Sequence, residues 1–174
     1  MSLQHLHVDL REFPLKPGDR SERAYDIQVA PLFLGGQRYE VLLGEDGVVL
    51  GVERVAGGFL VTVTLTAMLY GPCVRCLREV RVQASASEQE YAPTRGEEYE
   101  ETESSPFIQD MVVDVAGLAR EALILGLPAQ LLCREDCPGL CPSCGQDLRQ
   151  GACSCQAVPS DSRWERLKDL RLDS

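Results

Sequence analysis

Six of the eight cysteines in the chain lie within residues 133–155, and this stretch constrains the fold more than any other. Successive cysteines are separated by three, three, two, eight and one residues, with prolines and glycines among them. A helix or a strand cannot run through so many prolines and glycines, so the stretch is expected to be an irregular loop. A loop of this kind needs a covalent or metal cross-link to hold one conformation.

Disulfides and a metal ion are the two available cross-links, and the cellular compartment decides between them. The first ten residues lack the basic and apolar runs of a signal peptide, and no segment is apolar for long enough to span a bilayer. We therefore expect a cytoplasmic protein with reduced thiols. In that setting Cys141-Pro-Ser-Cys144 followed by Gly145 is typical of a zinc knuckle. Disulfides, a redox site and iron are the alternatives.

A second cysteine pair, Cys73 and Cys76, lies between two predicted strands at residues 59–70 and 77–91. In both strands, apolar or small residues alternate with polar ones, which indicates one buried face. The pair therefore lies at the tip of a β-hairpin, where the turn brings two thiols together as in a zinc knuckle. A thioredoxin-like redox motif would require a helix to begin there, and the pattern instead predicts a strand.

The rest of the chain predicts one main helix and several shorter strands. Asp114 is a suitable N-cap for a helix over residues 115–125, and Gly126 and Pro128 end it. Further elements are expected in these places: strands at residues 23–30, 48–55 and 107–113, turns at 35–36 and 45–47, and an amphipathic helix at 159–172.

These elements predict a single α+β domain. It comprises a β-rich body of about five to seven mostly antiparallel strands, one main helix, a cysteine-rich zinc-ribbon-like loop and a short C-terminal helix. The expected parts are a body with the C-x-x-C hairpin tip over residues 1–92, an acidic linker over 93–105, a strand and helix packed on the body over 106–130, a cysteine-rich zinc-binding loop over 131–157 and the C-terminal helix over 158–174.

Eight cysteines are enough for two four-thiolate sites, but the sequence leaves their pairing open. Closing the shortest loops groups the last four cysteines with one another and leaves the hairpin pair to join the first two of the loop. The sites are then Cys73, Cys76, Cys133 and Cys137, and Cys141, Cys144, Cys153 and Cys155. The main alternative joins the four cysteines of residues 133–144. In either arrangement, four thiolates fill a tetrahedral zinc ion and leave no position for a catalytic water, so a noncatalytic protein is expected.

The formal charge of −10 restricts the partners. Such a chain repels phosphates, which disfavours extensive nonspecific binding to nucleic acid and adhesion to an anionic membrane. A local basic patch or a basic protein partner remains compatible with that charge. The acidic residues of 93–105 form either a solvated linker or a docking segment for a basic partner. The candidate contacts to RNA or a partner are Arg75, Arg78, Arg81, Arg163, Arg166 and Lys168.

Several motifs, in their order along nearly the whole chain, resemble the bacterial YceD family. They are the pair Cys73-Val-Arg-Cys76 after a threonine-rich strand, the helix end at residues 123–128 (LILGLP), the run at residues 132–145 (LCREDCPGLCPSCG) and the tail at residues 161–170 (DSRWERLKDL). The sequence departs from the usual ribbon at Asp147-Leu-Arg149, where Asn-Leu-Asn is common in the family.

The resemblance implies a process rather than a reaction, because YceD proteins are described as large-subunit ribosomal RNA accumulation proteins. The expected function is a noncatalytic zinc-binding factor in large ribosomal subunit assembly. Its expected partners are large-subunit precursor RNA, the pre-large-subunit particle or a basic ribosomal protein. The alternative is a redox or RNA-processing accessory enzyme, which turnover of precursor ribosomal RNA by the pure protein would reveal.

Overall fold

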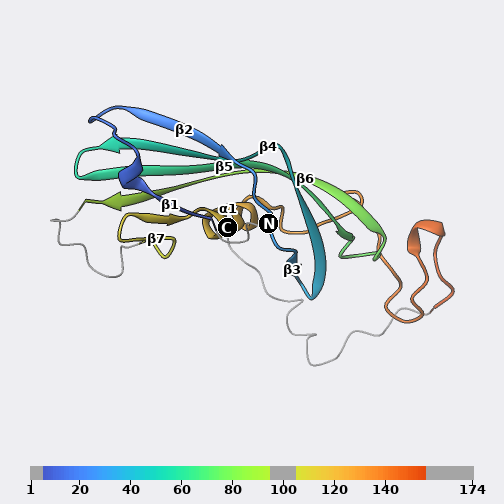
Figure 1. Cartoon of the computed structure of the whole chain (residues 1–174). Coiled ribbons are helices and arrows are strands. Elements are labelled where there is room, and N and C mark those ends of the chain that lie inside the picture. The colour runs from blue at the N-terminus through green and yellow to red at the C-terminus, as the bar shows by residue number, and fades with distance from the viewer. Residues whose placement is uncertain (1–5, 95–104, 156–174) are drawn as a thin grey trace, which may run out of the picture.

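The computed structural model describes residues 6–94 and 105–155 (Figure 1). Its largest element is an antiparallel sheet in the order β2-β4-β5-β6, and β3 pairs with the opposite end of β4. The strands of this main sheet are β2 (Arg20–Tyr25), β3 (Leu32–Leu34), β4 (Gln37–Val55), β5 (Gly58–Pro72) and β6 (Glu79–Pro93). A second sheet, in the order β1-β8-β7, contains β1 (His7–Asp9), β7 (Ile108–Gln109) and β8 (Val112–Asp114).

Helix α1 (Val115–Gly126) and the second sheet lie on the same side of the main sheet (Figure 1). The core lies between these layers because one face of β5 is apolar. Val61, Val63 and Leu65 on that face are buried, whereas Thr64 and Thr66 on the opposite face are exposed. Burying each such apolar side chain contributes roughly 1.5–3 kcal/mol, so this alternation fixes which side of the sheet receives α1.

Helix α1 begins and ends where the sequence predicts. The Asp114 carboxylate accepts a hydrogen bond from the Gly117 amide at 3.0 Å, as an N-cap does. Leu118 and Leu123 are fully buried in the core. At the end of the helix, a Cβ on Gly126 would lie 3.1 Å from the Ser85 carbonyl oxygen, so the helix packs closely on β6. The α+β class, the antiparallel β-rich body and the single main α-helix of the described residues are confirmed.

Three local predictions were wrong. The strand expected at residues 23–30 ends at Tyr25, and Ile27 is buried in the irregular segment that follows rather than in a strand. Residues 45–47 form no chain reversal but an irregularity within β4, where the register shifts between Leu43 and Val48. The backbone of Gly47 passes so close to the Tyr25 carbonyl that a Cβ there would clash.

The third difference concerns residues 107–113, which form a hairpin of β7 and β8 rather than one strand. Asp110 and Met111 lie at its turn with φ angles of 48° and 67°, a left-handed conformation that the apolar pattern does not reveal. The described residues consequently contain eight strands, one more than the upper end of the expected range. The helix expected at residues 159–172 lies outside the described residues.

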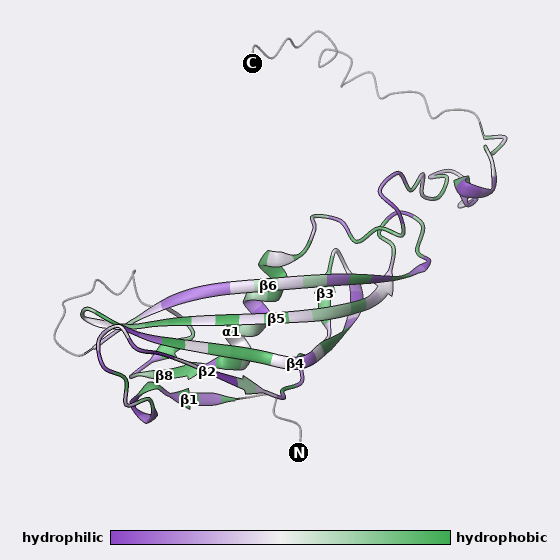
Figure 2. Ribbon diagram, turned by 90° about the horizontal axis from the view of Figure 1, so that it is seen from above, coloured by the Kyte–Doolittle hydropathy of each residue, from purple (hydrophilic) through white to green (hydrophobic). Residues whose placement is uncertain are grey.

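The cysteine-rich segment leaves the body at the end where β5 and β6 meet (Figure 2). Its only regular elements among the described residues are the 3-10 turn η3 (Leu148–Gln150) and an isolated bridge between Leu140 and Asp147. Within the described ranges, no helix has the length and apolar character needed to cross a membrane.

Candidate metal centres

The turn between β5 and β6 presents Cys73 and Cys76 on a tight backbone loop. The Cys73 amide donates to the Arg78 carbonyl at 2.7 Å, and the Leu77 amide donates to the Cys73 carbonyl at 2.9 Å. Leu77 adopts a φ angle of 59°, which reverses the chain directly after the second cysteine. Backbone amides inside the loop are thereby turned towards the sulfur atoms, as in a zinc knuckle.

Residues 141–146 repeat this geometry at the same spacing. The Cys141 amide donates to the Gln146 carbonyl at 2.8 Å, and the Gly145 amide donates to the Cys141 carbonyl at 2.8 Å. Gly145 has a φ angle of 74° and takes the place that Leu77 has in the first loop. We call these two loops the first and the second knuckle.

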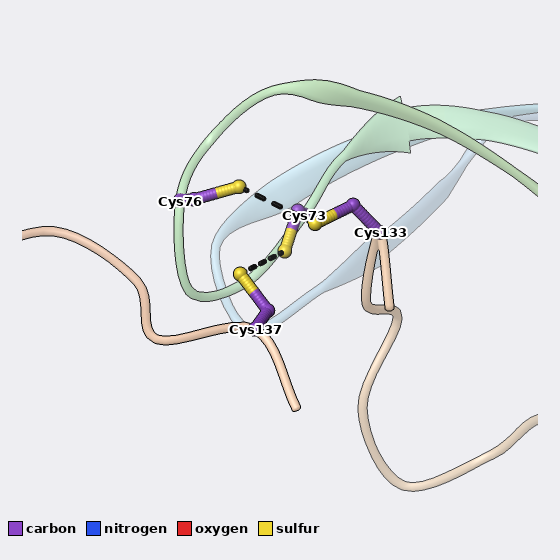
Figure 3. Close-up of side chains that lie close together, drawn as sticks. All are labelled: Cys73, Cys76, Cys133 and Cys137. Atoms are coloured by element: carbon purple, nitrogen blue, oxygen red, sulfur yellow. Dashed lines mark hydrogen bonds between the residues drawn. The ribbon is translucent and has the colours of Figure 1, made fainter. Parts of the chain in front are cut away.

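Cys133 and Cys137, from the segment after α1, complete the first knuckle (Figure 3). The four sulfur atoms lie within 4.8 Å of one another. The Cys73–Cys137 and Cys76–Cys133 sulfur pairs are 3.9 Å and 3.7 Å apart. A disulfide would require about 2.05 Å, whereas thiolates at about 2.3 Å from a shared tetrahedral ion lie about 3.8 Å apart. The spacing therefore fits a four-thiolate metal site, here called the first cluster.

The second knuckle is completed from its own loop. Its four sulfur atoms also lie within 4.8 Å of one another, and those of Cys141 and Cys153 are 3.3 Å apart. This second cluster consists of Cys141, Cys144, Cys153 and Cys155. The cysteines are thus grouped as the shortest-loop pairing predicts, and not as the alternative that joins residues 133–144.

The two clusters differ in their exposure to solvent. Three cysteines of the first cluster are buried and Cys133 lies on its outer side, whereas Cys141 alone is buried in the second. Burial by itself would raise the pKa of Cys73, but hydrogen bonds from the backbone at Cys133, Arg75 and Cys76 bring it down to about 6. Backbone hydrogen bonds from Cys144 and Ser143 likewise lower the pKa of Cys141 to about 6. Each knuckle thus favours one thiolate ready for a metal ion.

Other thiols hold their protons more tightly. Burial raises the pKa of Cys137. Hydrogen bonding to Cys144, together with burial, raises the pKa of Cys155 to about 12. A metal ion must displace these protons to bind, so occupancy of both clusters is expected to decrease as the pH falls.

The arginines beside the first knuckle, expected as RNA or partner contacts, are exposed but have partners within the chain. The Arg75 guanidinium donates to the Cys137 carbonyl at 3.1 Å and to the Gln130 amide oxygen at 3.0 Å. Arg78 pairs with Asp147 at 3.0 Å. Arg81 stacks over the Tyr70 ring at 5.4 Å. The other three candidate contacts, Arg163, Arg166 and Lys168, lie outside the described residues.

Two residues near the clusters, Asp147 and Arg149, were not predicted from the sequence to take part in the site. Asp147 and Arg149 lie in the loop of the second cluster and pair with each other at 2.6 Å. Both side chains are about five-sixths buried, with exposed fractions of 16% and 15%. The signal available in the sequence was an Asp-x-Arg pair of opposite charges within a cysteine-rich loop, a spacing that lets the aspartate accept from the arginine backbone as well as its side chain.

Comparison with known proteins identifies the family. The family model of "Large ribosomal RNA subunit accumulation protein YceD" matches residues 61–171, more than half of the chain. Uncharacterised proteins of Mycobacterium bovis and Mycobacterium tuberculosis are 32% identical over 170 residues, covering 94% of this chain and 80% of theirs. One of Mycobacterium leprae is 34% identical over 102 residues, covering 57% of this chain and 47% of its own. No solved structure matches significantly. The chain belongs to the YceD family.

Proposed function

We propose that this protein is a noncatalytic, zinc-binding factor that acts in the cytoplasm in large ribosomal subunit assembly and promotes accumulation of large-subunit ribosomal RNA. The observation that carries the proposal is the pair of four-cysteine clusters in a chain that the YceD family model matches. The family description names the process, and the clusters suggest how the protein takes part in it.

Zinc is the metal that these donors suit best. Four cysteine sulfurs at tetrahedral spacing, in knuckles with inward-turned backbone amides, favour zinc over metals that prefer oxygen ligands. Zinc would supply a cross-link and no bond-making chemistry, because four thiolates complete its coordination. Cys73, Cys76, Cys133 and Cys137 would hold one ion, and Cys141, Cys144, Cys153 and Cys155 the other.

The expected partner is a pre-large-subunit particle, contacted through precursor RNA or a basic ribosomal protein. Charge favours the protein contact, because a chain at −10 attracts a basic protein and repels an RNA backbone. The internal contacts of Arg75, Arg78 and Arg81 support the same choice, since a phosphate would have to compete with the partners these side chains already have. Ribosomal proteins are rich in lysine and arginine, so the complex is expected to weaken with salt.

Sedimentation of a cell lysate through a density gradient tests the proposal. The tagged full-length protein is expected to migrate with immature large-subunit particles at low salt and to leave them at high salt. A Cys73→Ser, Cys137→Ser variant, which removes one sulfur from each of the two segments that form the first cluster, should remain at the top of the gradient. Purified protein should contain two zinc ions per chain and should leave precursor ribosomal RNA uncut. Migration of the wild type only as a free small protein, or cleavage of the RNA, would contradict the proposal.

A further inference from the structure

The first cluster receives a contact from the loop of the second. The Arg149 guanidinium donates through Nη1 towards the Cys133 sulfur at 4.0 Å. Arg149 belongs to η3, between the second knuckle and the returning Cys153. A residue held by one metal cluster thus reaches a ligand of the other.

The Arg149 side chain is fixed in this position by Asp147. The Asp147 carboxylate accepts from the Arg149 backbone amide at 3.0 Å, from Nε at 3.0 Å and from Nη2 at 2.6 Å. Arg78, which follows the first knuckle, reaches the same carboxylate at 3.0 Å. The Arg149 fork therefore has little freedom, and its remaining nitrogen points to the sulfur.

The contact places positive charge beside a site that would be negatively charged when it holds zinc. A zinc ion with four thiolates carries a net charge of about −2. Arg78, Asp147 and Arg149 together carry a single net positive charge beside that site, and the Asp147 and Arg149 side chains are largely shielded from solvent. Hydrogen bonds and positive charge at a ligating sulfur stabilise its thiolate form and hence the bound metal.

A second pair in the same segment shows that an ordinary ion pair need not have this geometry. Arg134 pairs with Asp136 at 3.2 Å with the same two-residue spacing, but its side chain is 53% exposed and that of Asp136 is 82% exposed. Solvent therefore screens the charge of Arg134. Arg149 is shielded from solvent and also contacts a sulfur, and these two properties distinguish it from Arg134.

We propose that Arg149 is a positioning residue for the first metal site: it donates a hydrogen bond to the Cys133 thiolate, and it makes the metal affinity of the first cluster depend on the folding of the second. This inference rests on the proposal that both clusters bind zinc. By reciprocity, occupancy of the first cluster stabilises metal in the second to the same degree.

The test is performed on the full chain loaded with cadmium-113, which replaces zinc and reports each thiolate site as a separate nuclear resonance. Cys73→Ser identifies the resonance of the first cluster by its loss. Arg149→Gln is expected to shift that resonance and to lower the affinity of the first site about tenfold in competition with a chelator, the usual effect of removing a partner of a metal ligand. Arg134→Gln, the matched control, should change neither quantity.

Two further variants keep the test decisive. Arg149→Lys retains the charge but not the fork, so it should restore part of the affinity, and it carries the measurement if Arg149→Gln does not fold. Cys155→Ser should lower the affinity of the first site to a similar extent, and combining it with Arg149→Gln should add little. Two cadmium resonances with an unchanged first site in both Arg149 variants would overturn this inference alone. Failure of the wild type to bind cadmium would overturn the metal sites as well.

Discussion

The two clusters are built on knuckles with the same backbone geometry, but they connect different parts of the chain. The first joins residues far apart in the chain, with Cys73 and Cys137 separated by 64 positions and Cys76 and Cys133 by 57. The second closes a local loop in which Cys141 and Cys153 are 12 positions apart. The same ligand geometry thus serves two purposes. One cluster attaches the end of the β5–β6 hairpin to the segment after α1, and the other folds a short loop.

The largest difference is expected in the stability of the body. Cys137→Ser should lower the free energy of unfolding of the zinc-loaded protein by about 4 kcal/mol, the loop-closure value for a cross-link spanning 64 residues. Cys153→Ser should cost the body less, about 1–2 kcal/mol, because the second cluster affects the body only through the roughly tenfold higher metal affinity that it gives the first cluster. Chemical denaturation followed by circular dichroism of the sheet measures both. Equal losses of unfolding free energy in the two variants would show that both clusters stabilise the body to the same extent.

The next point to break is the contact between the first knuckle and the segment that joins the two clusters. Gly139 has a φ angle of 78°, and a Cβ there would lie 2.9 Å from the Arg75 carbonyl, which also accepts from the Leu140 amide at 3.2 Å. Gly139→Ala should therefore destabilise the protein by about 2–3 kcal/mol, combining left-handed strain with a steric clash.

Gly36→Ala is the matched control for this change. Gly36 has the same φ angle of 78°, but a Cβ there would have no atom within 4 Å, so this variant should show the strain alone, about 1 kcal/mol. Thermal unfolding of both variants gives the comparison. A Gly139→Ala loss no larger than that of Gly36→Ala would mean that the second loop moves away from Arg75 at little cost.

Acidification is expected to release metal from the two clusters at different pH values. Metal binding needs thiolates, so affinity decreases as the pH falls, by up to about tenfold per pH unit for each thiol that is protonated. The second cluster is more exposed and contains Cys155, whose thiol pKa is raised to about 12. It should lose its metal at a higher pH than the first cluster. A titration of the two cadmium-113 resonances from neutral to acidic pH measures the order, and earlier loss from the first cluster would reverse the expectation.

The smallest effect is expected where the knuckles themselves differ. Leu77 occupies a left-handed position that Gly145 fills in the second knuckle, and its side chain is 55% exposed. Leu77→Gly should remove strain and raise the free energy of unfolding by at most about 1 kcal/mol, offset in part by the greater freedom of glycine in the unfolded chain. Val74→Gly, at the exposed position after Cys73, should instead lower it. Denaturant midpoints of both variants are the measurement. A clear loss of stability in Leu77→Gly would show that the Leu77 side chain stabilises the fold by packing.

Much of the site was predictable from spacing and periodicity. The alternation in residues 59–70 placed Cys73 and Cys76 at a hairpin tip, and Asp114, Gly126 and Pro128 marked the ends of the helix. These features depend on near neighbours in the chain, where the pattern of apolar residues is informative. The pairing of cysteines was left open because spacing gives loop lengths but not which loops meet in space.

The features that sequence did not reveal depend on tertiary contacts. Arg75 looked like part of a free basic patch, yet its guanidinium holds Cys137 and Gln130, residues more than fifty positions away. The Arg149 contact to Cys133 requires the second loop to fold back on the first cluster. At the irregularity in β4, Gly47 passes close to the Tyr25 carbonyl, a contact between strands that the turn-like residues 45–47 do not reveal.

The long separation within the first cluster also has a consequence for synthesis. At about 5–20 residues per second, the ribosome that makes this chain needs roughly 3–11 s after Cys76 to add Cys133, 57 positions later. During that interval the growing chain exposes a finished half-site with two thiols and no partners. The strands of the main sheet are all synthesised before the first cluster can close, and the second cluster follows soon after it. If the clusters bind zinc as proposed, capture of the metal is a late event relative to synthesis of the sheet, and a nascent chain that stalls before Cys133 carries a knuckle that it cannot complete.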